Sequence, residues 1–140
     1  GEPIVVRKKI LAGDDEPHIV HVVASKLRNG GFDVVTAADG LEAYELALSE
    51  LPDLIFTDYQ MPGLSGLELC TKLRNEKQTH GIPAVMLTGR GFSLGTEDTA
   101  NTNIVKILPK PFSPREILQI AQTLLNTTGV VCSTAGESAS

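Results

Sequence analysis

Five polar side chains directly follow, or end, short apolar runs of the sequence. Asp14 and Asp15 follow the first run, Asp58 ends the third, Thr88 ends the fourth, and Lys110 ends the fifth. Adjacent carboxylates repel each other, and a buried carboxylate without a partner is costly. If the five side chains meet in the fold, their types therefore indicate a site that binds a cation.

Such a set of groups suits phosphoryl chemistry. Carboxylate oxygens with room for water favour Mg²⁺ over zinc as the bound ion. With Mg²⁺ and Lys110 offsetting the negative charge, an ionised Asp58 can attack a phosphoryl group, and Thr88 can hydrogen-bond one of its oxygens. The residues thus predict a Mg²⁺ site and a covalent aspartyl phosphate on Asp58.

The apolar runs also predict the scaffold that brings these residues together. They alternate with segments of helical periodicity, which is typical of an α/β protein with a doubly wound parallel sheet covered on both faces. All strands of such a sheet direct their carboxyl ends to one edge, where ligands bind. The five runs are residues 8–13, 32–37, 53–58, 82–88 and 103–110.

Helix starts are marked by capping patterns. We expect the first helix to begin near Pro17 and to end at Gly30, because proline suits the first helical position and glycine stops a helix. Asp39, Ser65 and Ser113 each stand three residues before a glutamate, which is the pattern of a capping box. These three residues therefore predict three further helix starts.

The remaining segments carry weaker signals. Residues 92–103 are rich in glycine, threonine and asparagine, so a helix there should be short. The chain divides by prediction into an N-terminal extension over residues 1–7, one domain over residues 8–125, and a disordered tail or linker stub over residues 126–140. The length of 140 residues is enough for one domain with its own core.

Composition excludes several classes of protein. A net charge of −5 argues against direct binding of nucleic acid, and no apolar run is long enough to cross a membrane. Cys70 and Cys132 lack metal-ligand spacing and suggest no disulfide framework. We therefore expect a cytoplasmic protein in a reducing compartment.

The order and spacing of these motifs resemble the receiver domain of two-component response regulators. The resemblance covers roughly Lys8 to Leu125 and rests on DDEP, DLIFTDYQMPGLSGLEL around Asp58, VMLTG around Thr88, and LPKPF around Lys110. It implies a five-stranded flavodoxin-like sheet in the order 2-1-3-4-5 with five flanking helices. It also implies a cis peptide bond after Lys110, which a following proline makes inexpensive.

The resemblance further implies the role of each residue. Asp58 would be the phosphoacceptor, and Asp15 and Asp58 would bind Mg²⁺ together with the backbone carbonyl of Gln60. Asp14 would act through metal-bound water. The two side chains that would hold the phosphoryl oxygens are Thr88 and Lys110.

The implied function is that of a signalling phosphoacceptor and not of an enzyme with a separate substrate. A sensor histidine kinase or a phosphotransfer protein would donate the phosphoryl group, and the receiver would then change its binding to a downstream effector protein or domain. The added negative charge gives a local cause for that change. The chain would catalyse only its own phosphorylation and dephosphorylation.

Departures from the family pattern leave alternatives open. Ile107 stands where an aromatic residue is usual, and Gly13 and Gly89 stand where larger residues are common. These departures motivate a second hypothesis, a pseudo-receiver that signals by binding without phosphorylation. A Mg²⁺-dependent phosphohydrolase is a third, although Tyr59 and Gln60 follow Asp58 and no acid stands two positions on.

Overall fold

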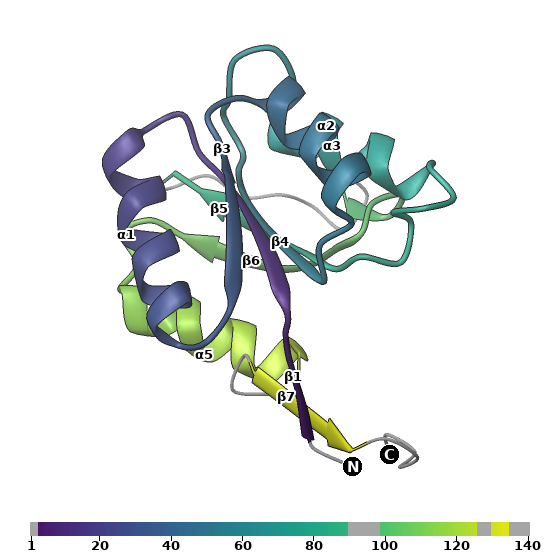
Figure 1. Ribbon diagram of the computed structural model, residues 1–140. Helices are drawn as coiled ribbons and strands as arrows, with labels where there is room; N and C mark the ends of the chain where they lie inside the picture. Colours follow the sequence, from purple (N-terminus) through teal and green to yellow (C-terminus); the bar gives the residue numbers. More distant parts are fainter. Residues whose placement is uncertain (1–2, 90–98, 126–129, 135–140) are drawn as a thin grey trace.

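A computed structural model describes residues 3–89, 99–125 and 130–134 of the chain. In this part of the chain four helices cover a five-stranded sheet, and a separate pair of strands projects from it (Figure 1). The elements, in chain order, are β1 (Pro3–Arg7), β2 (Lys9–Gly13), α1 (Pro17–Asn29), β3 (Asp33–Ala37), α2 (Gly40–Glu50), β4 (Leu54–Asp58), α3 (Gly66–Arg74), β5 (Ala84–Thr88), β6 (Ile104–Pro109), α5 (Pro114–Leu125) and β7 (Val130–Thr134).

The central sheet confirms the predicted topology. Its strands are all parallel and lie in the order β3-β2-β4-β5-β6, which is 2-1-3-4-5 when its own strands are counted along the chain. Helices α1 and α5 lie on one face, and α2 and α3 lie on the other (Figure 1). A sheet covered on both faces needs apolar residues at successive positions. Accordingly, all five residues of β4 and of β5 are buried.

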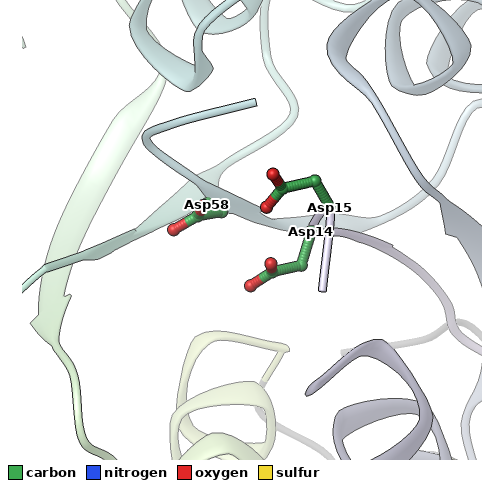
Figure 2. Close-up of side chains that lie close together, drawn as sticks. All are labelled: Asp14, Asp15 and Asp58. Atoms are coloured by element: carbon green, nitrogen blue, oxygen red, sulfur yellow. The ribbon is translucent and has the colours of Figure 1, made fainter. Parts of the chain in front are cut away.

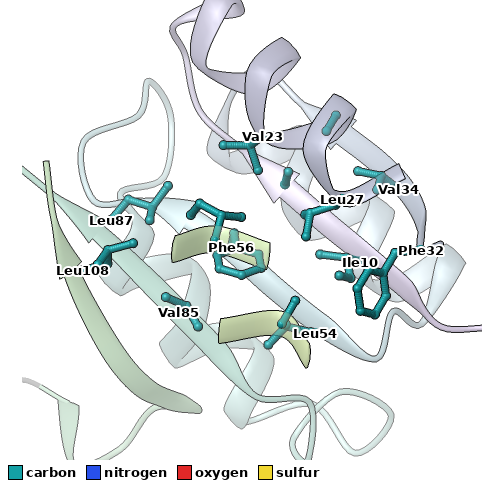
Figure 3. Packing of buried hydrophobic residues seen from close by; sticks show 14 residues of the cluster. Ile10, Val23, Leu27, Phe32, Val34, Leu54, Phe56, Val85, Leu87 and Leu108 are labelled. Carbon is teal, nitrogen blue, oxygen red and sulfur yellow. The ribbon is translucent and has the colours of Figure 1, made fainter. Parts of the chain in front are cut away.

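Two apolar clusters hold the layers together, one on each face of the sheet. The cluster beneath α1 and α5 joins Phe56 and Val85 of the central strands to Val23 and Leu27 of α1 (Figure 3). The opposite cluster joins the other face of the strands to α2 and α3, and Leu69 is fully buried there. These clusters fix the strands whose ends carry the polar residues.

The helix starts lie where the capping patterns predict them. Asp39 accepts a hydrogen bond from the backbone N–H of Glu42 at 2.8 Å. Ser65 forms a reciprocal capping box with Glu68, at 3.1 Å and 3.0 Å. Ser113 forms a similar pair of hydrogen bonds ahead of α5. Each cap satisfies backbone donors that the first helical turn leaves unpaired.

The two ends of the chain lie side by side in a pair of strands. Part of the segment 126–140, predicted to be a disordered tail or linker stub, forms β7, which pairs antiparallel with β1 from Pro3↔Thr134 to Arg7↔Val130. Small polar residues dominate the composition of that segment, but Val130 and Val131 are β-branched and favour a strand. Pairing with β1 gives the backbone of this run hydrogen-bond partners.

Three further predictions concern the fourth helix, one peptide bond and membrane-spanning helices. The helix expected over residues 92–103 lies largely outside the described residues. The peptide bond between Lys110 and Pro111 is cis, as expected. Among the described helices, none has the length and apolar character needed to span a membrane.

Candidate functional site

The carboxyl ends of the strands bring the predicted residues to one edge of the sheet. Asp14 directly follows β2, Asp58 ends β4, Thr88 ends β5, and Lys110 directly follows β6. Figure 2 shows the carboxylates of Asp14, Asp15 and Asp58 grouped at this edge. One oxygen from each of the three lies within 4.8 Å of the others. The sequence prediction of an acidic cluster is therefore realised in the fold.

Lys110 links two of these carboxylates. Its Nζ lies 3.1 Å from Oδ2 of Asp14 and 3.1 Å from Oδ1 of Asp58. Both aspartates are buried, with side chains 3% and 9% exposed, whereas Asp15 is exposed. Asp14 also accepts a hydrogen bond from the backbone N–H of Glu16 at 3.0 Å. One ammonium group is thus shared between two buried acids.

The site holds more negative charge than Lys110 neutralises. Burial raises the pKa of Asp14 above its ordinary value, although the Glu16 N–H and Lys110 partly counteract this. Burial and repulsion by Asp14 raise the pKa of Asp58, against the opposing effect of Lys110. Burial alone would lower the pKa of Lys110, but its hydrogen bonds to both acids raise it. A further cation would therefore be favoured at this cluster.

Thr88 presents an unused hydrogen-bonding group at the same edge. Its side chain is fully buried, and its Oγ1 has no hydrogen-bond partner among the described residues. A buried hydroxyl without a partner is costly unless a ligand supplies one. Strand β6 is tied to this position, because the Lys110 N–H donates to the Thr88 carbonyl at 2.7 Å. This backbone hydrogen bond therefore holds Lys110 beside Thr88.

The loop after Asp58 is fixed by backbone hydrogen bonds. Tyr59 donates its N–H to the Leu87 carbonyl at 2.8 Å and accepts from the Gly66 N–H at 2.7 Å. A Cβ on Gly66 would overlap the Asp58 carbonyl, so this close approach requires glycine. Gln60, whose carbonyl is predicted to bind metal, is an exposed residue of this loop.

Sequence reasoning missed one residue of this edge. Thr57 belongs to a predicted apolar strand, but its buried hydroxyl donates to the Asp58 carbonyl at 3.1 Å. A polar residue in a strand whose residues are all buried was the available signal. The histidines His18, His21 and His80 are exposed, and none belongs to a group of metal-binding side chains in the described part of the chain.

Comparison with known proteins identifies the family. The profile of the response regulator receiver domain matches residues 10–122. The chain belongs to this family, as the motifs predicted. It is a receiver domain of the response regulator type, and its role is in two-component signalling.

Relatives of the chain include longer transcriptional regulators. It is 38% identical to the alkaline phosphatase synthesis transcriptional regulatory protein PhoP of Bacillus subtilis, covering 89% of this chain and 51% of PhoP. It is 34% identical to the phosphate regulon transcriptional regulatory protein PhoB of Pseudomonas aeruginosa, covering 89% of this chain and 55% of PhoB. The chain therefore spans about half the length of these curated relatives.

Solved structures of receiver domains share the fold. The chemotaxis protein CheY4 of Vibrio cholerae superposes with a TM-score of 0.77 at 32% identity, covering 84% of this chain and 98% of CheY4. The receiver domain of the sensor histidine kinase PA1611 from Pseudomonas aeruginosa PAO1 gives a TM-score of 0.77 at 26% identity, and the match covers 87% of this chain and 100% of that domain. That structure contains a magnesium ion coordinated in its active-site cleft. In this chain, Asp14, Asp15 and Asp58 form a cluster of acidic groups that could hold a metal ion.

The structure shows the surroundings of the three residues that depart from the family pattern, Ile107, Gly13 and Gly89. Ile107 is half-buried and packs against the cluster on the α2 and α3 face. A Cβ on Gly13 would meet neighbouring atoms only at ordinary contact distances, 3.7 Å or more, and a Cβ on Gly89 would meet nothing within 4 Å. The two glycines therefore leave space at the edge that carries the acids.

Proposed function

We propose that Asp58 is the phosphoacceptor of this receiver domain. The observation that carries the proposal is the pairing of its buried carboxylate with Lys110 at 3.1 Å, at an edge where the Thr88 hydroxyl lacks a partner among the described residues. An oxygen of Asp58 forms a bond to phosphorus while the bond from phosphorus to the donor breaks. Lys110 and Thr88 then hydrogen-bond the oxygens of the transferred group.

We further propose that Mg²⁺ binds to the acidic cluster. Asp15 and Asp58 would hold the ion directly with the Gln60 carbonyl, and Asp14 would act through a bound water. The three carboxylates within 4.8 Å and the raised pKa of Asp58 fit a hard divalent cation with oxygen ligands. When bound, the ion offsets negative charge on the phosphoryl oxygens.

The donor we propose is a phosphohistidine of a sensor histidine kinase or a phosphotransfer protein. As the oxygen–phosphorus bond to Asp58 forms, the phosphorus–nitrogen bond of the donor breaks, and the donor imidazole takes up one proton from the solvent as it leaves. Phosphorylation replaces the single negative charge of the Asp58 carboxylate with roughly two on the phosphoryl group beside Asp14, which gives a local cause for altered binding to a downstream effector. In this proposal the chain itself contacts no nucleic acid and catalyses only its own phosphorylation and dephosphorylation.

The test is phosphorylation by acetyl phosphate, followed by intact-protein mass spectrometry. With MgCl₂ the protein should gain the mass of one phosphoryl group, and with EDTA it should not. Asp58→Asn should abolish the gain, because an amide oxygen is a poor nucleophile. Asp53→Asn is the matched control, since Asp53 lies just before the other end of β4, where it accepts from the Lys9 N–H at 2.8 Å.

Two outcomes would contradict the proposal. Wild-type protein that gains no phosphoryl mass under Mg²⁺ would favour a pseudo-receiver that signals by binding alone. A gain that persists in Asp58→Asn would place the phosphoryl group on another residue.

A further inference from the structure

The hydroxyl of Thr57 lies where three parts of the site meet. It donates to the Asp58 carbonyl at 3.1 Å, and it lies 3.9 Å from Sδ of Met61 in the loop after β4. It would also lie 3.8 Å from a Cβ at Gly13, the last residue of β2. The side chain of Thr57 is fully buried, so this arrangement is held by packing.

The carbonyl of Asp58 lies beyond the end of a strand ladder. The pairing of β2 with β4 ends at Gly13↔Thr57, and Asp14, the residue after β2, donates its N–H to the carbonyl of Ala37 in β3 at 3.2 Å. The Thr57 hydroxyl therefore supplies the carbonyl of Asp58 with a hydrogen bond at a position where the pairing of β4 with β2 has ended.

The peptide group after Asp58 is consequently held on both sides. Its carbonyl accepts from the Thr57 hydroxyl, and its N–H, which belongs to Tyr59, donates to Leu87 of β5 at 2.8 Å. The next carbonyl, that of Tyr59, accepts from the Gly66 N–H at 2.7 Å. The carbonyl after that belongs to Gln60. Two anchored peptide groups thus lead from Asp58 to the carbonyl proposed to bind metal.

We infer that Thr57 is a positioning residue for the Mg²⁺ site. By holding the peptide between Asp58 and Tyr59, its hydroxyl sets the positions of the Asp58 carboxylate and the Gln60 carbonyl relative to each other. Groups that orient metal ligands without touching the metal usually affect affinity by 10-fold or more. This inference rests on the proposed function, because it assumes that these two groups bind Mg²⁺.

The test compares variants that keep the shape of Thr57 with variants that keep its hydroxyl. Thr57→Val removes the hydroxyl and should weaken Mg²⁺ binding roughly tenfold. Thr57→Ser keeps the hydroxyl and should bind Mg²⁺ within about twofold of wild type. The Mg²⁺ dissociation constant is measured by isothermal titration calorimetry with MgCl₂ and checked by amide chemical-shift changes.

Thr79 offers a matched control in the same protein. It is also fully buried, and its hydroxyl donates to the Leu73 carbonyl at 2.7 Å, at the end of α3. Thr79→Val loses the same kind of hydrogen bond, so it should lower thermal stability but leave Mg²⁺ affinity unchanged. A structural effect of threonine removal would instead appear in both variants.

The possible results separate this inference from the proposed function. If wild-type protein binds Mg²⁺ and Thr57→Val binds it equally well, the inference is wrong and the proposed function stands. If wild-type protein binds no Mg²⁺ at millimolar concentrations, the proposed metal site fails and the inference fails with it. If Thr57→Val does not fold, the serine variant decides, because a tenfold weakening there would show that the hydroxyl is not what matters.

Discussion

Replacing Asp58 with asparagine should make the metal-free protein more stable, although it removes the residue proposed to carry the chemistry. The Asp58 carboxylate is buried, and it shares Lys110 with Asp14. Burial and repulsion by Asp14 raise its pKa, which means that its ionised form is disfavoured in the folded state. An amide of the same shape avoids this cost.

The magnitude follows from the charges around Asp58. At an effective dielectric constant of about 20, attraction to Lys110 at 3.1 Å is worth about 5 kcal/mol, and repulsion between two charges that lie within 4.8 Å of each other costs about 3.5 kcal/mol or more. Asp14 supplies that repulsion, and the exposed Asp15 adds less because water screens it. The remaining attraction, about 2 kcal/mol at most, is smaller than the several kcal/mol that burying a carboxylate costs. We therefore expect Asp58→Asn to raise the free energy of unfolding by about 2 kcal/mol.

Thermal unfolding in EDTA at pH 7 measures this change. The melting temperature of Asp58→Asn should rise by about 6 °C, while Asp53→Asn should stay close to wild type. Adding MgCl₂ should narrow the difference, because an ion that binds only the folded state stabilises the wild type. An Asp58→Asn variant that melts below wild type in EDTA would refute this balance of burial cost, attraction and repulsion.

The pH dependence of the same difference has a definite sign. Because the pKa of Asp58 is raised in the folded state, the folded protein binds a proton more tightly than the unfolded chain does. Stability is therefore gained as the pH falls through the folded pKa towards the ordinary value of 3.8, and it is lost as the pH rises. The advantage of Asp58→Asn over wild type should shrink between pH 7 and pH 4.

Three further substitutions or reagents test the packing around the site. Gly13→Ala should raise the free energy of unfolding by about 0.5 to 1 kcal/mol in urea titrations, because the new Cβ makes only ordinary contacts and the unfolded chain loses freedom. Gly66→Ala should lower it by about 2 kcal/mol or more, since the new Cβ overlaps the Asp58 carbonyl, and a neutral result would show that the loop can yield. The Cys70 thiol is buried and burial raises its pKa to about 12, so iodoacetamide at pH 8 should label its peptide only after unfolding, and rapid labelling of the native protein would contradict its burial.

The acidic edge could be predicted because two regularities of sequence coincide. A run of apolar residues marks a strand buried on both faces, and a parallel sheet sends every strand end to the same edge. Asp14, Asp58, Thr88 and Lys110 each lie at or directly after such an end, so their meeting required only the fold class. Their distances required the structure, because side-chain geometry is not encoded in spacing.

Other features depend on contacts between distant segments. Strand β7 is stabilised by pairing with β1, which lies at the opposite end of the chain. Its five residues stand among small polar ones, so the local sequence only weakly indicates a strand. The inferred positioning role of Thr57 depends on where the pairing of β2 with β4 ends. The alternation of apolar and polar residues along the sequence does not specify that point. The capping pairs were predictable for the opposite reason, since a cap and its partner are three residues apart.

The unsatisfied groups of the site offer a source of free energy for the proposed switch. In the metal-free protein, Lys110 is divided between two buried acids, and the hydroxyl of Thr88 has no partner among the described residues. In the proposed mechanism, both deficits would disappear when a cation neutralises the acids and a phosphoryl group on Asp58 offers its oxygens to Lys110 and Thr88. A ligand shifts a conformational equilibrium only by the free energy with which it favours one state. The cost borne by the unphosphorylated site is therefore the source of the free energy that phosphorylation can use to move the structure around it.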